Sequence, residues 1–229
     1  METWTVRDVM TQRVVSVDRA ASYRTMVDLL TDHRISAVPV IDEAGHVLGV
    51  VSETDLLRKI EYAGGEEPRI FDGPRRRDDR RRSRAGIAAD LMSSPPVVVT
   101  ADTSITAAAR TMDREGVKRL PVVDEQGRLS GIVTRGDLLK VHLRPDGEIL
   151  ADVRAGVLDR FLSEDSETVV VAVVDGVVTL SGKVDRWSSA DIAARLTRQV
   201  AGVVDVNSTL EYRFDDSQVY GSRLGFGTL

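Results

Sequence analysis

Cysteine is absent from the 229 residues, and histidine occurs only three times. Without cysteine, neither a disulfide framework nor a thiolate metal site can form. The histidines, His33, His46 and His142, lack the spacing of metal ligands, so we expect no bound metal. The first ten residues contain no apolar segment like that of a signal peptide, and the longest apolar run, Val169–Val174, is too short to span a bilayer. These absences predict a cytoplasmic protein.

Catalytic motifs are also missing. The sequence has no Gly-x-Ser-x-Gly elbow and no Walker-type lysine loop. Its many carboxylates fall mostly in predicted turns and on polar helix faces. We therefore expect a protein that is not an enzyme. The net charge of −5 disfavours a simple nucleic-acid-binding protein, although the distribution of charge matters more than its sum.

The chain contains an internal repeat. The Asp-Val-Met of residues 8–10 recurs 82 residues later as the Asp-Leu-Met of residues 90–92. The same offset, without a gap, relates Pro39-Val40 to Pro121-Val122, Asp42-Glu43 to Asp124-Glu125, Gly45 to Gly127, Gly49 to Gly131, and Asp55–Leu57 to Asp137–Leu139. A gapless register of this length indicates two copies of one structural unit.

Each copy is predicted to have the order β-α-β-β-α. The predicted elements of the first copy are a strand at Val14–Val17, an amphipathic helix at about Ser22–Asp32, strands at Val38–Ile41 and Val47–Val51, and a helix from about Thr54. Gly45 can supply the positive φ that the hairpin turn needs. Ser22 and its counterpart Ser104 are suitable N-caps, because a serine oxygen accepts hydrogen bonds from free N–H groups at a helix start.

The segment between the copies, residues 63–85, has a different composition. Glycines and prolines lead into a run of arginines broken by aspartates at residues 75–84. This segment cannot bury apolar surface, so we predict a flexible linker. A solvated, self-repelling loop is typical of such a charge run, and a phosphate-binding arm is the alternative. Acidic sequence flanks the run on both sides, so we do not expect nucleic-acid binding at physiological salt.

The two copies resemble the CBS-domain family, which forms paired units called Bateman modules. The resemblance covers roughly residues 3–143 and rests on the Asp-Val-Met-Thr motif, the strands at Ala37–Val40 and Arg119–Val122, and the segments Gly49–Asp55 and Gly131–Asp137. It implies CBS domains at residues 3–62 and 86–143. It also implies an adenine nucleotide, AMP, ADP or ATP, as a regulatory ligand.

The resemblance assigns roles to two Ser/Thr-x-x-Asp motifs. In the family the aspartate binds the ribose and the hydroxyl faces phosphate. Asp55 and Asp137 are therefore implied as ribose ligands, with Ser52 and Thr134 near phosphate. The chemistry agrees, because a helix N-terminus attracts phosphate and a carboxylate accepts from ribose hydroxyls. The alternative is that both aspartates are ordinary helix N-caps.

Copy two carries more positive charge around its motif. The differing pairs are Ser36 and Lys118, Ala37 and Arg119, and Glu53 and Arg135. Phosphate binding needs cations, and an arginine can engage phosphate through two hydrogen bonds. We therefore expect the Asp137 site to be the stronger one, so that Asp137→Ala costs more affinity than Asp55→Ala. A surface position for Lys118 and Arg119 is the alternative.

The resemblance has two further implications. The family's pseudo-two-fold axis brings the two motifs together, so that Ile35, Ser36 and the strand near Thr11–Val14 line the Asp137 site. The resemblance also implies a homodimer, because Bateman modules pair through the apolar faces of their helices. Each helix has an apolar face to cover, and exposed apolar patches of that size are unusual in monomers.

A third unit is predicted over residues 148–213, with the order α-β-β-α-β. Its predicted elements are a helix over Ile149–Leu162, strands at Thr168–Val174 and Val177–Val184, a helix after Trp187 and a strand from Gly202. Asp175-Gly176 is a favoured two-residue hairpin turn. With the segments Gly176–Gly182 and Gly202–Asn207, this unit resembles the BON domain.

BON domains are associated with phospholipid or cell-envelope surfaces. Residues 148–213 carry seven Lys or Arg against eleven Asp or Glu, and an acidic domain gains nothing from anionic headgroups. We therefore expect this unit to contact an unidentified protein partner, and membrane association is the alternative. Residues 214–229 are expected to form a poorly ordered tail.

The predicted fold class is α+β, a Bateman module followed by a small BON domain. The leading hypothesis is a regulatory adenine-nucleotide-binding protein that couples ligand occupancy to partner contacts. The alternatives are a ligand-free dimerisation or tethering scaffold and a protein that associates with membranes through the BON domain.

Overall fold

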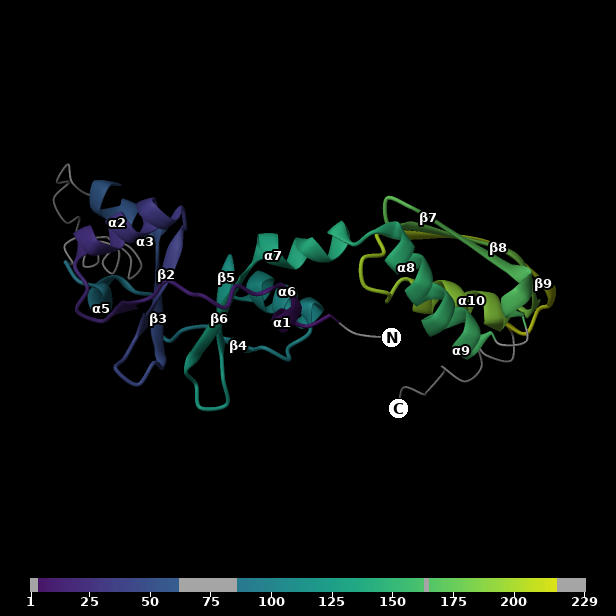
Figure 1. The fold of residues 1–229 in the computed structure, drawn as a ribbon, viewed down its shortest axis with the longest axis horizontal. Coiled ribbons are helices and arrows are strands. Elements are labelled where there is room, and N and C mark those ends of the chain that lie inside the picture. The colour runs from purple at the N-terminus through teal and green to yellow at the C-terminus, as the bar shows by residue number, and fades with distance from the viewer. Residues whose placement is uncertain (1–3, 62–85, 163–164, 218–229) are drawn as a thin grey trace, which may run out of the picture. The chain divides into compact units, whose positions relative to one another are not determined.

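The computed structural model describes residues 4–61, 86–162 and 165–217, so the predicted linker at residues 63–85 lies outside the described part of the chain. The chain divides into two compact units. One spans Thr5–Leu138 and contains both copies of the repeat, and the other contains Trp4 together with the chain from Leu139 onward (Figure 1). The first unit has helices and two three-stranded sheets, and the second has helices and one three-stranded sheet. This confirms the α+β class.

The first copy consists of a leading helix, a three-stranded sheet and two further helices. Its elements are α1 (Val6–Val9), β1 (Val17–Asp18), α2 (Tyr23–His33), β2 (Ala37–Ile41), β3 (Val47–Ser52) and α3 (Glu53–Glu61). The strand order is β1-β2-β3, with β1 parallel and β3 antiparallel to β2. The predicted hairpin is confirmed, and Gly45 in its turn has a φ of 87°. The first strand is shorter than predicted, because only Val17 and Asp18 pair with β2.

The second copy repeats this arrangement. Its elements are α5 (Ala88–Leu91), β4 (Val99–Thr100), α6 (Ile105–Arg114), β5 (Arg119–Val123), β6 (Leu129–Thr134) and α7 (Arg135–Leu139). The sheet has the order β4-β5-β6 with the same strand directions. The predicted N-caps are confirmed: the Ser22 hydroxyl oxygen accepts from the Thr25 N–H at 3.1 Å, and that of Ser104 accepts from the Ala107 N–H at 3.2 Å. The sequence repeat is therefore also a structural repeat.

The two copies exchange their leading helices. The N–H of Val6 in α1 donates to the Thr103 carbonyl of copy two at 2.8 Å, and the N–H of Ala88 in α5 donates to the Ala21 carbonyl of copy one at 2.9 Å. Leu91 of α5 is buried in the core of copy one, and Figure 1 shows α5 beside that sheet. Neither copy therefore has a complete core without a segment of the other.

Gly49 and Gly131 permit the close approach between the copies. A Cβ at Gly49 would lie 2.7 Å from the sulfur of Met92, and a Cβ at Gly131 would lie 2.7 Å from the sulfur of Met10. Ordinary carbon contacts are about 3.5–4.0 Å, so a side chain at either position would push the leading segment away. The repeated glycine thus follows from packing between copies.

The C-terminal unit confirms the predicted α-β-β-α-β order. Its elements are η1 (Lys140–Leu143), α8 (Asp146–Val153), the π-helical turn η2 (Arg154–Leu158), α9 (Asp159–Phe161), η3 (Ser166–Thr168), β7 (Val169–Val174), β8 (Val177–Arg186), α10 (Trp187–Thr197) and β9 (Asp205–Phe214). The strand order is β7-β8-β9, with β7 antiparallel and β9 parallel to β8. Helices α8 and α10 cover one face of the sheet, over a core that contains Ile149, Val178 and Leu180 (Figure 1). The first helix begins before the predicted Ile149 and is interrupted by the π-helical turn.

Acidic side chains fix two connections of this unit. The Asp146 carboxylate accepts from the N–H groups of Asp175 and Gly176, both at 2.9 Å, and so holds the predicted hairpin turn. Asp216, only 4% exposed, accepts from the Ser188 N–H at 2.9 Å and from its hydroxyl at 2.7 Å near the start of α10. The expectation of a poorly ordered tail from residue 214 is wrong at its beginning, because Phe214 pairs with β8 and Asp216 is bound.

Candidate functional site

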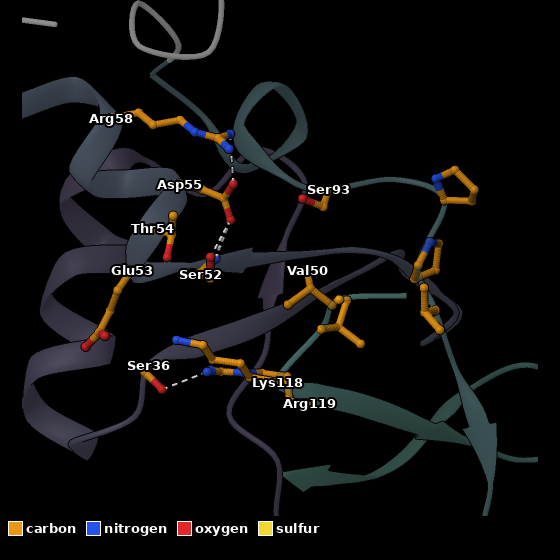
Figure 2. Close-up of a pocket in the computed structure, with 15 residues that line it drawn as sticks. Ser36, Val50, Ser52, Glu53, Thr54, Asp55, Arg58, Ser93, Lys118 and Arg119 are labelled. Carbon is orange, nitrogen blue, oxygen red and sulfur yellow. Dashed lines mark hydrogen bonds and ion pairs between the residues drawn. The ribbon is translucent and has the colours of Figure 1, made fainter. Parts of the chain in front are cut away.

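A cavity of about 380 Å³ lies between the two copies of the repeat (Figure 2). Its volume is within the range of small-molecule sites, which is about 300–1,000 Å³. Copy one contributes Ser36, Val50, Ser52, Glu53, Thr54, Asp55 and Arg58, and copy two contributes Ser93, Pro95, Pro96, Val97, Gly116, Val117, Lys118 and Arg119. The cavity thus joins an apolar wall to a cluster of acidic, basic and hydroxyl side chains.

Asp55 binds the start of its own helix. Its Oδ2 accepts from the Ser52 N–H at 2.9 Å and from the Ser52 hydroxyl at 2.6 Å, and its Oδ1 lies 3.3 Å from a guanidinium nitrogen of Arg58. The Asp55 residue is 5% exposed. Asp55 is the third residue of α3, so its carboxylate accepts from the N–H of the residue that precedes the helix, as the acidic residue of a capping box does. The predicted alternative, an ordinary N-cap, would instead accept from N–H groups inside the helix. Because an ionised carboxylate has about four acceptor positions, the same group can also accept from a ligand.

The second motif has the same geometry. Asp137 Oδ2 accepts from the Thr134 N–H at 2.9 Å and from the Thr134 hydroxyl at 2.7 Å. The segment around Thr11, which was expected near this motif, lies beside it as an isolated bridge and not as a strand, since Thr11 and Ile132 exchange two backbone hydrogen bonds of 2.9 Å. By the repeat, Ser93 and Val50 make the corresponding pair near Asp55.

Lys118 and Arg119 line the Asp55 cavity, whereas the sequence prediction grouped them with Asp137. The backbone of Arg119 pairs with Thr134 of its own copy, but its guanidinium crosses to copy one and donates to the Ser36 hydroxyl at 2.8 Å (Figure 2). The backbone of Arg119 therefore lies beside the Thr134 motif, while its side chain lies in the cavity of the Asp55 motif. Ser36, also expected at Asp137, lies in the Asp55 cavity with it.

The remaining predicted residue, Ile35, packs against the core of copy one and is absent from the cavity lining. The wall formed by Ser93, Pro95, Pro96 and Val97 was missed. The repeat could have revealed this wall, because the 82-residue offset relates it to the segment that begins at Thr11, which was predicted to lie beside Asp137. Applying that relation to the first motif would have identified this wall.

Burial lowers the pKa of the Arg119 guanidinium from its ordinary value, and the Glu53 carboxylate acts in the opposite direction. Arginine stays charged at neutral pH despite such a shift. The cavity therefore holds a partly desolvated cation next to a lysine, which favours an anionic ligand group.

Comparison with known proteins identifies both parts of the chain. The family model of the CBS domain matches residues 6–62 and 88–144, and that of the BON domain matches residues 145–213. The chain belongs to the CBS-domain family. Its two CBS repeats are followed by a BON domain, as the motifs predicted.

Relatives match the CBS pair. An uncharacterised protein of Methanopyrus kandleri is 30% identical over 136 residues, which are 59% of each chain. The chloroplastic CBS domain-containing protein CBSX2 of Arabidopsis thaliana is 31% identical over 153 residues, which are 62% of this chain and 64% of that protein. A crystal structure of CBSX2 in complex with AMP has a TM-score of 0.54 and 32% identity, and covers 61% of this chain and 97% of the solved one. The chain spans less than two thirds of the length of these two relatives.

Among the residues that the structure describes, every helix is too short or too polar to cross a bilayer.

Proposed function

We propose that this CBS-domain protein is a regulatory protein that binds an adenine nucleotide in the Asp55 cavity. The observation that carries the proposal is the cavity itself, in which a buried carboxylate, a helix start and two cations from the other copy meet. The AMP complex of CBSX2, whose chain is similar over the CBS pair, supports an adenine ligand. AMP, ADP and ATP remain the candidate nucleotides.

The side chains suggest how the nucleotide binds. Asp55 accepts from the ribose hydroxyls, and the Ser52 hydroxyl faces phosphate. Lys118 and Arg119 neutralise the phosphate, because arginine and lysine donate charge-assisted hydrogen bonds to it. The apolar wall at Pro95, Pro96 and Val97 offers a surface for the base. Thr134 and Asp137 form a second, weaker site on the other side of the pseudo-two-fold axis.

A ligand titration tests the proposal. We expect calorimetry on ligand-free protein to detect AMP, ADP or ATP and to show much weaker binding of NADH, S-adenosylmethionine and a cyclic dinucleotide. A nucleotide present at 100 times its dissociation constant should also stabilise the protein by about 2.7 kcal/mol. If no adenine compound binds, the CBS pair is the ligand-free scaffold of the alternative hypothesis.

The helices support the proposed homodimer. An apolar groove of about 390 Å³ lies between α2 and α3 and is lined by Tyr23, Val27, Leu30, Thr31, Glu53, Leu56, Leu57 and Ile60. Leu57 and Ile60 are 57% and 68% exposed, and Leu139, the counterpart of Leu57 in copy two, is 65% exposed. We propose that a second copy of the chain covers this face.

Leu57→Glu is therefore expected to dissociate the dimer. A carboxylate buried in an apolar contact loses its hydration without gaining a partner, so the dimer dissociation constant should rise at least about tenfold. Light scattering at micromolar concentration should show about twice the 25.1 kDa chain mass for the wild type and the monomer mass for the variant. Val98→Glu, at an exposed apolar residue outside the groove, is the control. A wild-type protein that is monomeric at this concentration would contradict the proposal.

The BON domain is proposed to contact a protein partner when the CBS pair changes its ligand state. Its excess of acidic residues over residues 148–213 disfavours anionic lipid. Ligand occupancy in the CBS pair would then reach the partner through the full chain, since coupling requires that the ligand change the contacts at a second site.

A further inference from the structure

Glu53 places a negative charge in a cavity that otherwise suits phosphate. Its backbone N–H donates to the Ser36 carbonyl at 3.0 Å, and the Ser36 hydroxyl accepts from Arg119 at 2.8 Å. Ser36 therefore contacts the backbone of Glu53 through its carbonyl and the guanidinium of Arg119 through its hydroxyl, and Figure 2 shows the second of these contacts. Glu53 is exposed and lines the same cavity as Lys118 and Arg119, and its carboxylate raises the pKa of Arg119 against the effect of burial.

The fold does not require an acid at this position. In copy two the equivalent residue is Arg135, whose N–H donates to the Lys118 carbonyl at 3.1 Å, so the backbone role is the same. Two side chains of opposite charge thus occupy the same structural position. A carboxylate in the first turn of a helix is mildly favourable, but Arg135 shows that this gain is dispensable here.

Charge at the cavity is nearly balanced. Among the described residues that line it, the cations Arg58, Lys118 and Arg119 face the carboxylates Glu53 and Asp55. Arg58 is already close to Asp55, at 3.3 Å. Lys118 and Arg119 can therefore match the roughly two negative charges of one phosphate group, and Glu53 opposes any further negative charge.

We propose that Glu53 restricts the Asp55 cavity to nucleotides with a single phosphate and disfavours di- and triphosphates. The inference rests on the proposed nucleotide function of this cavity. It makes Glu53 a specificity-determining residue, because its repulsion grows with the number of phosphate charges while the contacts to ribose and base stay the same.

Glu53→Gln removes the charge and keeps the shape of the side chain. Two unit charges about 10 Å apart in water change a binding constant by about twofold. For ligands with about two and about four negative charges, we therefore expect AMP affinity to rise about fourfold and that of metal-free ATP about sixteenfold at low ionic strength. The ratio of the ATP and AMP dissociation constants should fall about fourfold.

The experiment is calorimetry with AMP and ATP in the full chain carrying Asp137→Asn, which isolates the Asp55 cavity. Glu53→Asp, which keeps the charge, should leave the ratio within about twofold of its starting value. Arg135→Gln, at the equivalent position of copy two, should do the same. Equal changes for AMP and ATP, or no change, would overturn the role of Glu53 while leaving nucleotide binding intact. Absence of any adenine-nucleotide binding before Glu53 is changed would overturn both proposals.

Discussion

Gly182→Ala is expected to destabilise the C-terminal unit strongly while the stability of the CBS pair stays nearly unchanged. Gly182 in β8 has a φ of +120°, a conformation that side-chain-bearing residues rarely adopt. A Cβ there would overlap the carbonyl oxygen of Thr168 and lie 3.3 Å from the Cα of Val169, where β7 begins. The strand cannot move away easily, because Val169 pairs with Gly182 and the Thr168 hydroxyl donates to the Lys183 carbonyl at 2.6 Å.

Backbone strain and overlap together should cost about 3–5 kcal/mol. For a unit of this size, each kcal/mol lowers the melting temperature by about 4–8 °C, so we expect a fall of at least about 12 °C. Scanning calorimetry of the full chain should show this fall in one transition and little change in the transition of the CBS pair. Small domains bury proportionally little surface, which leaves little stability to absorb such a loss.

Gly147→Ala is the matched control in the same unit. Gly147 lies in α8, has nothing within 4 Å of the position of a Cβ, and is not among the glycines with positive φ. Alanine in a helix is favoured over glycine by about 0.5–1 kcal/mol, so this variant should melt slightly higher than the wild type. Equal melting temperatures for Gly182→Ala and the wild type would contradict the strain argument.

Local structure was largely predictable because it depends on nearby residues. The helix that begins after Ser22, the hairpin turn at Gly45 and the turn at Asp175-Gly176 all follow from capping and backbone preferences at single positions. Asp175 and Gly176 have φ values of 51° and 74°, which suit the two-residue turn that the sequence predicted. Such preferences are encoded within a few residues of where they act.

The exchange of leading helices was not predictable from local pattern. Four-residue helices such as α1 carry too little periodicity to be recognised, and Val6 and Val9 give no sign of which copy buries them. The π-helical turn at Arg154–Leu158 was missed for a similar reason, since the apolar stripe continues through it. In both cases tertiary packing decides between arrangements that the sequence pattern allows equally.

At the candidate site, too, the sequence revealed the local structure but not the tertiary contacts. Both Ser/Thr-x-x-Asp motifs were found from sequence, because each is a local helix start. The partner of each motif depends on the direction of long side chains at the copy boundary. Arg119 reaches Ser36 in the other copy, so its position in the chain did not reveal the cavity that it serves.

From this geometry we propose that the Asp55 site binds AMP more tightly than the Asp137 site, the opposite of the order that the sequence predicted. We expect Asp55→Asn to weaken the tightest binding of AMP about 10- to 100-fold, because a ribose ligand loses its charge-assisted hydrogen bonds. Arg119→Ala should weaken it by at least about tenfold through the lost phosphate contact. Asp137→Asn should change it by less than about threefold, since Lys118 and Arg119 line the other cavity. Calorimetry of each variant with AMP provides the measurement.

Asparagine is chosen because its Oδ1 can still accept from the N–H of Ser52 or Thr134, so α3 and α7 keep their starts and the variants stay folded. Arg119→Lys separates charge from geometry: a lysine keeps the cation but loses the forked contact, so intermediate affinity is expected. If Asp137→Asn instead removed the tightest AMP binding and Asp55→Asn left it intact, Lys118 and Arg119 would bind phosphate at the Asp137 motif in solution. The strongest AMP binding would then occur at Asp137, with which the sequence prediction grouped these two cations. Arg119 would then bind phosphate from a position other than the one beside Ser36.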